Sequence, residues 1–198
     1  QVPLSAPEPV SSTAGADNTR HDFVNALATD GNGHWVCAWH SNDSTGAGGL
    51  GTDNDILVSR SANDGQSWSA AAPLNTTAAG DGSSNDRMVS LATDGNGLWI
   101  ALWMSNNPIN GTGPDIDILL SRSTDDGATW TPPVALATNA EEDSGLDFDP
   151  LITFSSGTWL AAWRTTDTLG GTLETDGDLL FVRSTNGGAN WSDPAPLN

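Results

Sequence analysis

Short apolar segments of about five to eight residues alternate with turns rich in Gly, Asp and Asn along this chain. In Trp35-Val-Cys-Ala-Trp39, alternation places the aromatic and small residues on one face of a strand and the aliphatic residues on the other. Apolar groups on both faces are typical of a sheet that is packed on both sides. The pattern predicts first strands at residues 23–29, 88–93 and 151–154, second strands at 35–39, 99–103 and 159–163, third strands that begin at 55, 117 and 178, and fourth strands at 68–74, 130–136 and 191–197.

The nine Trp residues reveal an internal repeat. Trp68, Trp130 and Trp191 are 62 and 61 residues apart, and the other six Trp fall into the same register. A period near 60 residues built from strand-sized segments predicts the blades of a β-propeller. We therefore expect an all-β fold, a β-propeller of four-stranded antiparallel blades that forms a single segment over residues 1–198, with blades at 22–74, 86–136 and 147–198 and an extra outer strand at 2–10.

A motif follows each third strand, and it carries a family resemblance. Ser123-Thr-Asp125-Asp-Gly127-Ala-Thr129-Trp130 matches Ser-x-Asp-x-Gly-x-Thr-Trp at every position. This sequence resembles the Asp-box, or bacterial neuraminidase repeat, of sialidase-like β-propellers, which implies that fold. The box is a hairpin device that enzymes and non-enzymes share, so we expect a structural role for its residues. The expected box residues are Ser61, Asn63, Gly65 and Trp68, then Ser123, Asp125, Gly127 and Trp130, then Ser184, Asn186, Gly188 and Trp191.

Three blades are too few to close a propeller ring. A four-stranded face of about six residues covers roughly 400 Å², so two apolar end faces approach the upper limit for a monomer. Pairing two chains about a two-fold axis covers such faces and gives an interface of standard size. We expect half of a six-bladed ring, completed either by a second copy in a homodimer or by a second half from further sequence.

The charge of the chain limits its partners. Its net charge is −19, with no Lys and no Tyr, which argues against nucleic acid and anionic membranes. No apolar run approaches the roughly 18 residues of a membrane span, so we expect no membrane insertion. Cys37 is the single cysteine and is expected to be a small packed residue. Acidic, Gly- and Asp-rich loops and a start at Gln1 without Met favour a processed, secreted or periplasmic bacterial protein.

An Asp-x-Asp pair recurs where each third strand begins. The pairs are Asp53 and Asp55, Asp115 and Asp117, and Asp176 and Asp178. Clustered carboxylates beside Gly-rich backbone suit Ca²⁺, which takes six to eight oxygen ligands. The same residues also cap turns by accepting loop N–H groups, and this role repeats because the blade repeats. Both interpretations stay open, with Ca²⁺ as the only cofactor considered.

The family resemblance also implies a set of catalytic residues. Sialidases of this family hold the substrate carboxylate with three Arg and use a Tyr nucleophile, a Glu that activates it and an Asp acid/base. Arg87-Met-Val-Ser-Leu91 lies where the family has Arg-Ile-Pro-x-Leu, although the Pro is absent, so Arg87 is the candidate for one Arg. The nucleophile is missing, because the chain has no Tyr. Dense carboxylates would also repel the carboxylate of a sialic acid.

These observations favour a non-catalytic propeller module that binds glycan, protein or Ca²⁺ through an acidic face formed by the long loops. One alternative is a sialidase-like exo-glycosidase, or a fragment of one, completed by residues outside this sequence. Another is hydrolysis of a neutral glycan by two carboxylates, although nothing in the sequence singles out a pair.

Overall fold

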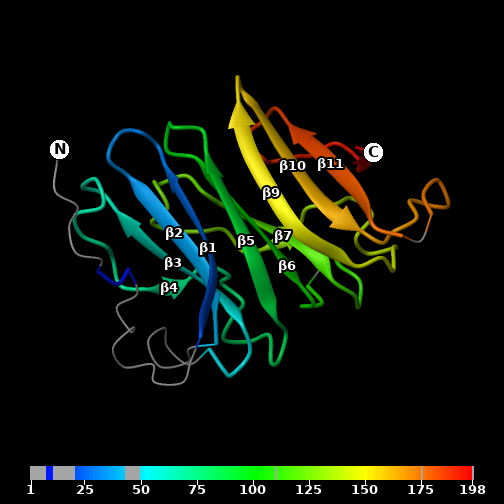
Figure 1. Ribbon diagram of the computed structural model, residues 1–198, viewed down its shortest axis with the longest axis horizontal. Coiled ribbons are helices and arrows are strands. Elements are labelled where there is room, and N and C mark those ends of the chain that lie inside the picture. Colours follow the sequence, from blue (N-terminus) through cyan, green and yellow to red (C-terminus); the bar gives the residue numbers. More distant parts are fainter. Residues whose placement is uncertain (1–7, 11–20, 43–49, 110, 175, 198) are drawn as a thin grey trace.

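The computed structural model describes residues 8–10, 21–42, 50–109, 111–174 and 176–197, and these contain strands and turns but no helix. Twelve strands form three four-stranded antiparallel sheets, so the predicted propeller blades are confirmed. The blades stand side by side in chain order, with β1, β5 and β9 as their innermost strands (Figure 1). Blade 1 contains β1 (Asp22–Thr29), β2 (Trp35–Ser41), β3 (Asp55–Ser61) and β4 (Ala72–Pro73); blade 2 contains β5 (Asp86–Thr93), β6 (Trp99–Ser105), β7 (Asp117–Ser123) and β8 (Val134–Ala135); blade 3 contains β9 (Asp147–Ser155), β10 (Thr158–Thr165), β11 (Asp178–Ser184) and β12 (Ala195–Pro196).

The outer strands are shorter than the sequence predicts, with two residues each. In every blade a hydroxyl just after the box Trp accepts the backbone N–H of an Arg in the third strand, as Thr131 does for Arg122 at 3.0 Å. Proline within these segments also removes a backbone donor. Regular backbone pairing between the third and fourth strands of a blade therefore covers only two residues. The extra outer strand expected at 2–10 lies mostly outside the described residues, and 8–10 are not in a strand.

The second strands hold the blades together. In blade 2, Trp99, Ala101 and Trp103 pack against aliphatic residues of blade 1. In blade 3, Trp159 and Trp163 pack in the same way on blade 2, against a face that includes Ile100. All four of these Trp side chains are buried. The alternation of large and small residues thus produces two unlike faces that fit the neighbouring blades, as the pattern predicts.

Each Asp-box closes the turn after a third strand. In blade 2, the Ser123 hydroxyl donates to Asp125 Oδ1 at 2.7 Å and accepts the N–H of Gly127 at 2.9 Å. Asp125 also accepts the N–H and the hydroxyl of Thr129. The other two boxes repeat the serine and main-chain bonds with Asn63 and Asn186 in place of the Asp. These bonds hold the turn at the end of the blade opposite the long loops.

Replacing Asp125 with Ala should lower the free energy of unfolding by roughly 1–2 kcal/mol at pH 7, because three hydrogen bonds are lost. Hydrogen bonds from Thr129 lower the pKa of Asp125 to about 2. This contribution is therefore fully present above the ordinary value of 3.8 and disappears as the pH falls through about 2. Denaturant unfolding of Asp125→Ala at several pH values measures it. Asp125→Asn is the control and should cost less than half as much, because Asn63 and Asn186 fill this position in the sister boxes.

Candidate functional site

Two acidic clusters lie at the ends of the blades that carry the long loops. The first cluster joins Asp53 and Asp55, at the start of β3, to Asp81 from the connection between β4 and β5. The second cluster repeats this arrangement one blade later, and consists of Asp115, Asp117 and Asp143. In each cluster one carboxylate oxygen from every residue lies within 4.8 Å of the others. The structure therefore brings together two of the three Asp-x-Asp pairs and adds a third carboxylate to each.

The third pair does not form such a cluster. Asp176 is exposed and Asp178 is half-buried, and no group of three acids includes them in the part of the chain that the structure describes. Sequence analysis missed Asp81 and Asp143, although they are 62 residues apart and so follow the same repeat. That spacing was the available signal. The connection between blades supplies the third carboxylate, and the third pair has no such connection beside it among the described residues.

The clusters contain buried oxygens without hydrogen-bond donors. Asp117 is 1 % exposed, and neither of its carboxylate oxygens accepts a hydrogen bond. Both oxygens of Asp53, both of Asp115 and one oxygen of Asp143 are also buried without a donor. The nearby N–H of Gly113 donates to the carbonyl of Ala140. A capping carboxylate accepts N–H groups, and these oxygens accept none, so turn capping and metal binding both stay predictions for the Asp-x-Asp pairs.

Burial and mutual repulsion disfavour the charged forms. Two unit charges about 5 Å apart repel by roughly 3 kcal/mol at an effective dielectric constant near 20. Burial raises the pKa of Asp117 to about 7, and the charge of Asp115 adds to this shift. Burial also raises the pKa of Asp55 and of Asp143 to about 7, and that of Asp81 to about 6. The ionised carboxylates of each cluster therefore repel one another, and binding of a proton or a cation would reduce this repulsion.

A further buried carboxylate stands beside each cluster. Asp86 begins β5, and the Asn75 side-chain amide donates both to it and to Asp55. Asp147 begins β9 in the equivalent position, and burial raises its pKa to about 8. The Asn139 amide donates to Asp143 at 2.7 Å and to Asp167 at 2.9 Å. Two asparagines therefore hold the carboxylates in place from the connections between blades.

A cleft of about 680 Å³ opens beside the second cluster. Its walls come from the β8–β9 connection, the loop after β10 and the outer strand of blade 3. Hydroxyl, amide and carboxylate groups line it, among them Thr138, Asn139, Glu142, Asp167 and Asp193. None of the described residues that line the cleft is aromatic. The cleft thus offers many hydrogen-bonding groups but no ring for stacking.

Arg87 lies on the innermost strand of blade 2, at the same end as the acidic clusters. Its side chain is exposed and donates to the Asn85 side-chain oxygen at 3.0 Å. A β-bulge follows at Met88, which has φ +55°, and β9 carries a matching residue, Asp149 with φ +54°. No carboxylate lies within 4.0 Å of the Arg87 guanidinium among the described residues. The Arg87 side chain, which the sequence singles out, is therefore accessible to solvent, and its catalytic role stays a prediction.

Blade 3 offers a second arginine at this end, but a carboxylate accompanies it. The Arg164 guanidinium lies 4.7 Å from the centre of the Phe148 ring, and its Nε is 3.8 Å from Asp149 Oδ2.

Between β1, β5 and β9 lies an apolar groove of about 370 Å³ that includes Leu27, Met88 and Leu151. This end of the blades thus presents Arg87 on β5 and Arg164 on β10, together with an apolar groove between the innermost strands.

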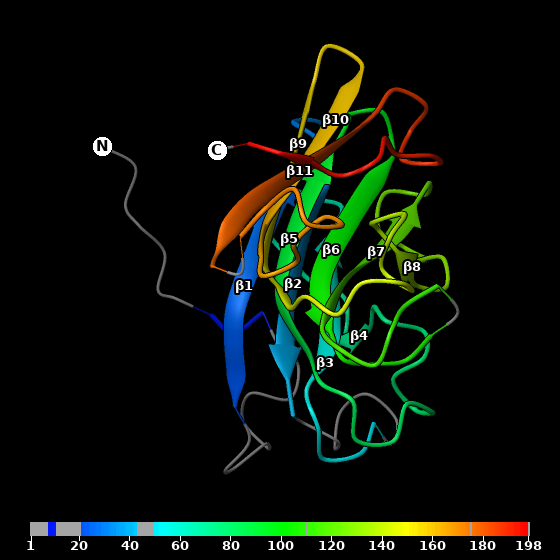
Figure 2. The ribbon, with the colours of Figure 1, turned by 90° about the vertical axis from the view of Figure 1, so that its right-hand side faces the viewer.

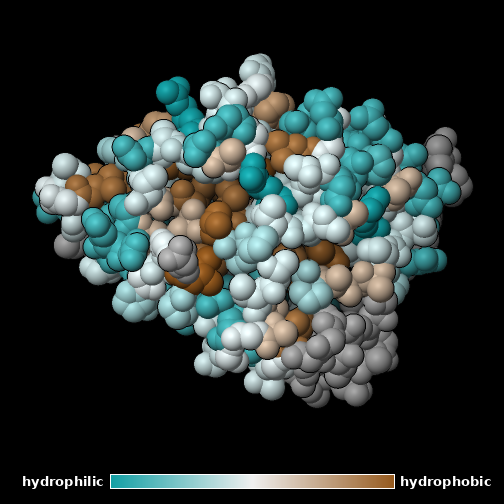
Figure 3. Space-filling view, turned by 180° about the vertical axis from the view of Figure 1, so that it is seen from behind, coloured by the Kyte–Doolittle hydropathy of each residue, from teal (hydrophilic) through white to brown (hydrophobic). Residues whose placement is uncertain are grey.

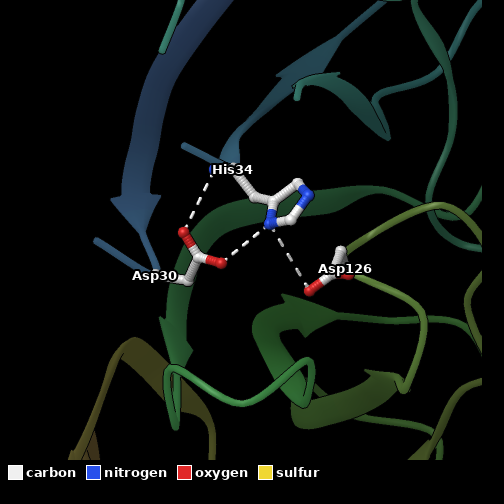
Figure 4. A group of neighbouring side chains, drawn as sticks. All are labelled: Asp30, His34 and Asp126. Atoms are coloured by element: carbon white, nitrogen blue, oxygen red, sulfur yellow. Dashed lines mark hydrogen bonds and ion pairs between the residues drawn. The ribbon is translucent and has the colours of Figure 1, made fainter. Parts of the chain in front are cut away.

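A third group of metal-type ligands lies on the Asp-box side and has a structural explanation. His34 Nδ1 is 2.8 Å from Asp30 and 3.8 Å from Asp126, which joins a turn of blade 1 to the box of blade 2 (Figure 4). Although partial burial acts to raise it, hydrogen bonds from His34 and Asn32 hold the pKa of Asp30 below its usual range. The His34 ring pairs with a carboxylate from each of the two blades, so this interaction stabilises the contact between blades 1 and 2.

Known structures share this architecture. No protein-family model matches the sequence, and no curated protein matches it. Among solved structures, the Hadza microbial sialidase Hz136 matches with a TM-score of 0.64 and 21% identity, over 88% of this chain and 37% of that protein. Trypanosoma rangeli sialidase matches with a TM-score of 0.58 and 18% identity, over 86% and 30%. Penicillium chrysogenum α-L-arabinanase complexed with arabinobiose matches with a TM-score of 0.54 and 18% identity, over 83% and 45%.

These matches show a sialidase-like β-propeller fold. The chain spans about a third of the length of the first two sialidases, so it corresponds to part of such a propeller. Its two acidic clusters repeat from blade to blade, whereas a glycosidase has one catalytic centre. In the described residues, no helix has the length and apolar character needed to cross a membrane.

Proposed function

We propose that this chain is a non-catalytic, sialidase-like propeller module that binds carbohydrate through the cleft at its long-loop end. The cleft carries the proposal, because its polar groups converge in a concavity of about 680 Å³, a size typical of small-molecule sites. Exposed Glu142 and Asp193 provide acceptors for sugar hydroxyl groups. The similarity to proteins named as sialidases and as an arabinanase supports a glycan as the ligand class.

The charge of the cleft favours a neutral glycan. Among the described residues, five acidic or amide side chains and no cationic side chain line it; the five are Asn139, Glu142, Asp143, Asp167 and Asp193. A sialic acid carboxylate would meet like charge there. The absence of Tyr from the sequence supports a binding role without sialidase chemistry.

Binding of neutral and sialylated oligosaccharides, measured by calorimetry or on a glycan array, tests the proposal. We expect neutral glycans to bind, and Glu142→Ala to weaken binding by roughly tenfold, the effect of one hydrogen bond to a charged group. Glu141→Ala is the matched control, because Glu141 is exposed next to the cleft without lining it. Equal losses from both variants, or no binding at millimolar glycan, would contradict the proposal.

The second candidate is a sialidase-like exo-glycosidase that needs residues from outside this sequence. The accessible Arg87 guanidinium, without a carboxylate partner in the described part of the chain, favours this candidate. It predicts that a fluorogenic sialoside is hydrolysed only when further blades provide Tyr, Glu and more Arg. Hydrolysis by the 198-residue chain alone would overturn the non-catalytic proposal.

A further inference from the structure

We propose that each acidic cluster binds one Ca²⁺ ion, which links the start of a third strand to the connection leading into the next blade. The two sites are Asp53, Asp55 and Asp81 at the junction of blades 1 and 2, and Asp115, Asp117 and Asp143 at the junction of blades 2 and 3. The second site shares Asp143 with the wall of the carbohydrate cleft, whereas no residue of the first site lines it, so Ca²⁺ binding at the first site can be tested apart from the proposed function.

The second cluster provides the clearest evidence. Asp117 is almost completely buried, neither of its oxygens has a hydrogen-bond donor, and one of them lies within 4.8 Å of an oxygen of Asp115 and of Asp143. The oxygens of Asp115 and one oxygen of Asp143 are likewise without donors. The Asn139 side-chain oxygen is a further buried acceptor without a donor, and the amide of the same side chain holds Asp143. Buried acceptors without donors are rare in folded proteins, and a cation between the three carboxylates would provide a partner for one oxygen of each.

The first cluster repeats this arrangement with different supporting residues. Both oxygens of Asp53 and one of Asp81 are buried without donors. The adjacent Asp86 is 1 % exposed, and its Oδ1 also has no donor. Asn75 fixes Asp55 with a hydrogen bond of 3.1 Å.

In the described part of the chain, no cationic side chain forms an ion pair with either cluster. The ion pairs among the described residues join His34 to Asp30 and Asp126, and Arg164 to Asp149. None of these includes a carboxylate of either cluster. The negative charge of each cluster is therefore left for protons or a bound ion to neutralise.

The donor set and the local backbone favour Ca²⁺. All donors are oxygens, which suits hard divalent cations, and irregular loops suit the variable geometry of Ca²⁺ better than the strict octahedron of Mg²⁺. A glycine precedes each of the two clustered Asp-x-Asp pairs by two residues, and a Cβ on Gly51 or Gly113 would lie 2.7 Å from an oxygen of Asp53 or Asp115. A larger residue at either position would therefore force the carboxylate to move. The third repeat has Glu174 at this position and no cluster among the described residues.

Calorimetric titration of the EDTA-treated protein with CaCl₂ at constant pH tests the proposal. We expect two ions per chain, one for each cluster, together with a higher Tm. Tb³⁺ provides a second readout, because Trp103 lies beside Asp86 and Trp163 lies beside Asp147, close enough to sensitise its luminescence. Asp117→Asn should reduce the number of ions from two to one. The charge-matched control Asp149→Asn should leave two, since Asp149 is exposed and its positive φ suits Asn.

Other results would overturn the inference. Absence of both heat and a Tm shift at millimolar Ca²⁺ would do so, as would two ions bound to Asp117→Asn, or binding of Mg²⁺ in preference to Ca²⁺. Should Asp117→Asn fail to fold, Asp115→Asn makes the same test at a half-buried position, and the wild-type stoichiometry requires no variant.

Discussion

Replacing Gly127 with Ala should lower the free energy of unfolding by roughly 2–5 kcal/mol. Gly127 has φ +78°, a conformation that costs an L-residue about 1–2 kcal/mol. A Cβ there would also lie 2.5 Å from Cγ2 of Val36, a fully buried residue of the preceding blade. Such overpacking costs typically about 1–3 kcal/mol. Denaturant unfolding monitored by Trp fluorescence measures the loss.

The first Asp-box provides a matched control for this substitution. Gly65 has φ +75°, and a Cβ there would meet nothing within 4 Å. Gly65→Ala should therefore show the backbone cost alone, and the difference between the two variants measures packing between blades. Val36→Ala should destabilise the Gly127→Ala variant less than it destabilises the wild type, because it removes the methyl groups that the new Cβ would contact. Equal losses at Gly65 and Gly127 would contradict the packing of the box on the preceding blade.

The repeated Asp-box also shows why the fold was predictable from sequence. The Trp spacing reports the period, and the alternation in Trp99-Ile-Ala-Leu-Trp103 reports two apolar faces. Together they determine the number of blades and their packing. Burial of Cys37 follows from the same register. These features are local and periodic, and such patterns survive in a single sequence.

The candidate sites depend on segments that the periodic pattern does not describe. Asp81 and Asp143 lie in irregular connections between blades, so the fold of these connections brings them to the Asp-x-Asp pairs. The pair at Asp176 and Asp178 has the same local sequence but no third carboxylate beside it in the described residues. The bulge at Met88 has no glycine to signal its positive φ. Sequence therefore predicts two of the three carboxylates in each cluster, and the connections between blades provide the third.

Exposed apolar side chains lie on the face of blade 3 at the end of the array. Leu160, Leu179 and Leu197 are 40%, 43% and 60% exposed. Ile100 and Ile118, at the positions in blade 2 equivalent to Leu160 and Leu179, are buried by blade 3. Figure 2 views the molecule from this end, and Figure 3 shows apolar patches on the blade 3 side of the surface seen from behind. Within a propeller, the next blade would cover this face.

Blade 1 does not offer the complementary face in an accessible form. Its outward-facing Cys37, Trp39 and Leu57 are already buried, and Val10 from the preceding segment packs against this cluster. The two-fold, six-bladed ring expected from the sequence brings blade 3 of one copy against blade 1 of the other, and it would have to displace Val10 from this face. For the chain as it stands, a two-fold contact between two copies of the blade 3 face requires no such rearrangement.

We therefore expect the 198-residue chain to form concentration-dependent dimers through blade 3. Each face contributes about 400 Å², and the total of about 800 Å² lies in the range of weak, transient interfaces. Light scattering after gel filtration should show the average mass rising toward a dimer as the protein concentration increases. Leu179→Glu should keep the chain monomeric, because it buries a charge at the contact. Val134→Glu, an equally exposed apolar position on the outer strand β8, should leave the dimer intact. A monomer at every concentration, or an equal effect of both substitutions, would show that copies of this chain do not cover the blade 3 face.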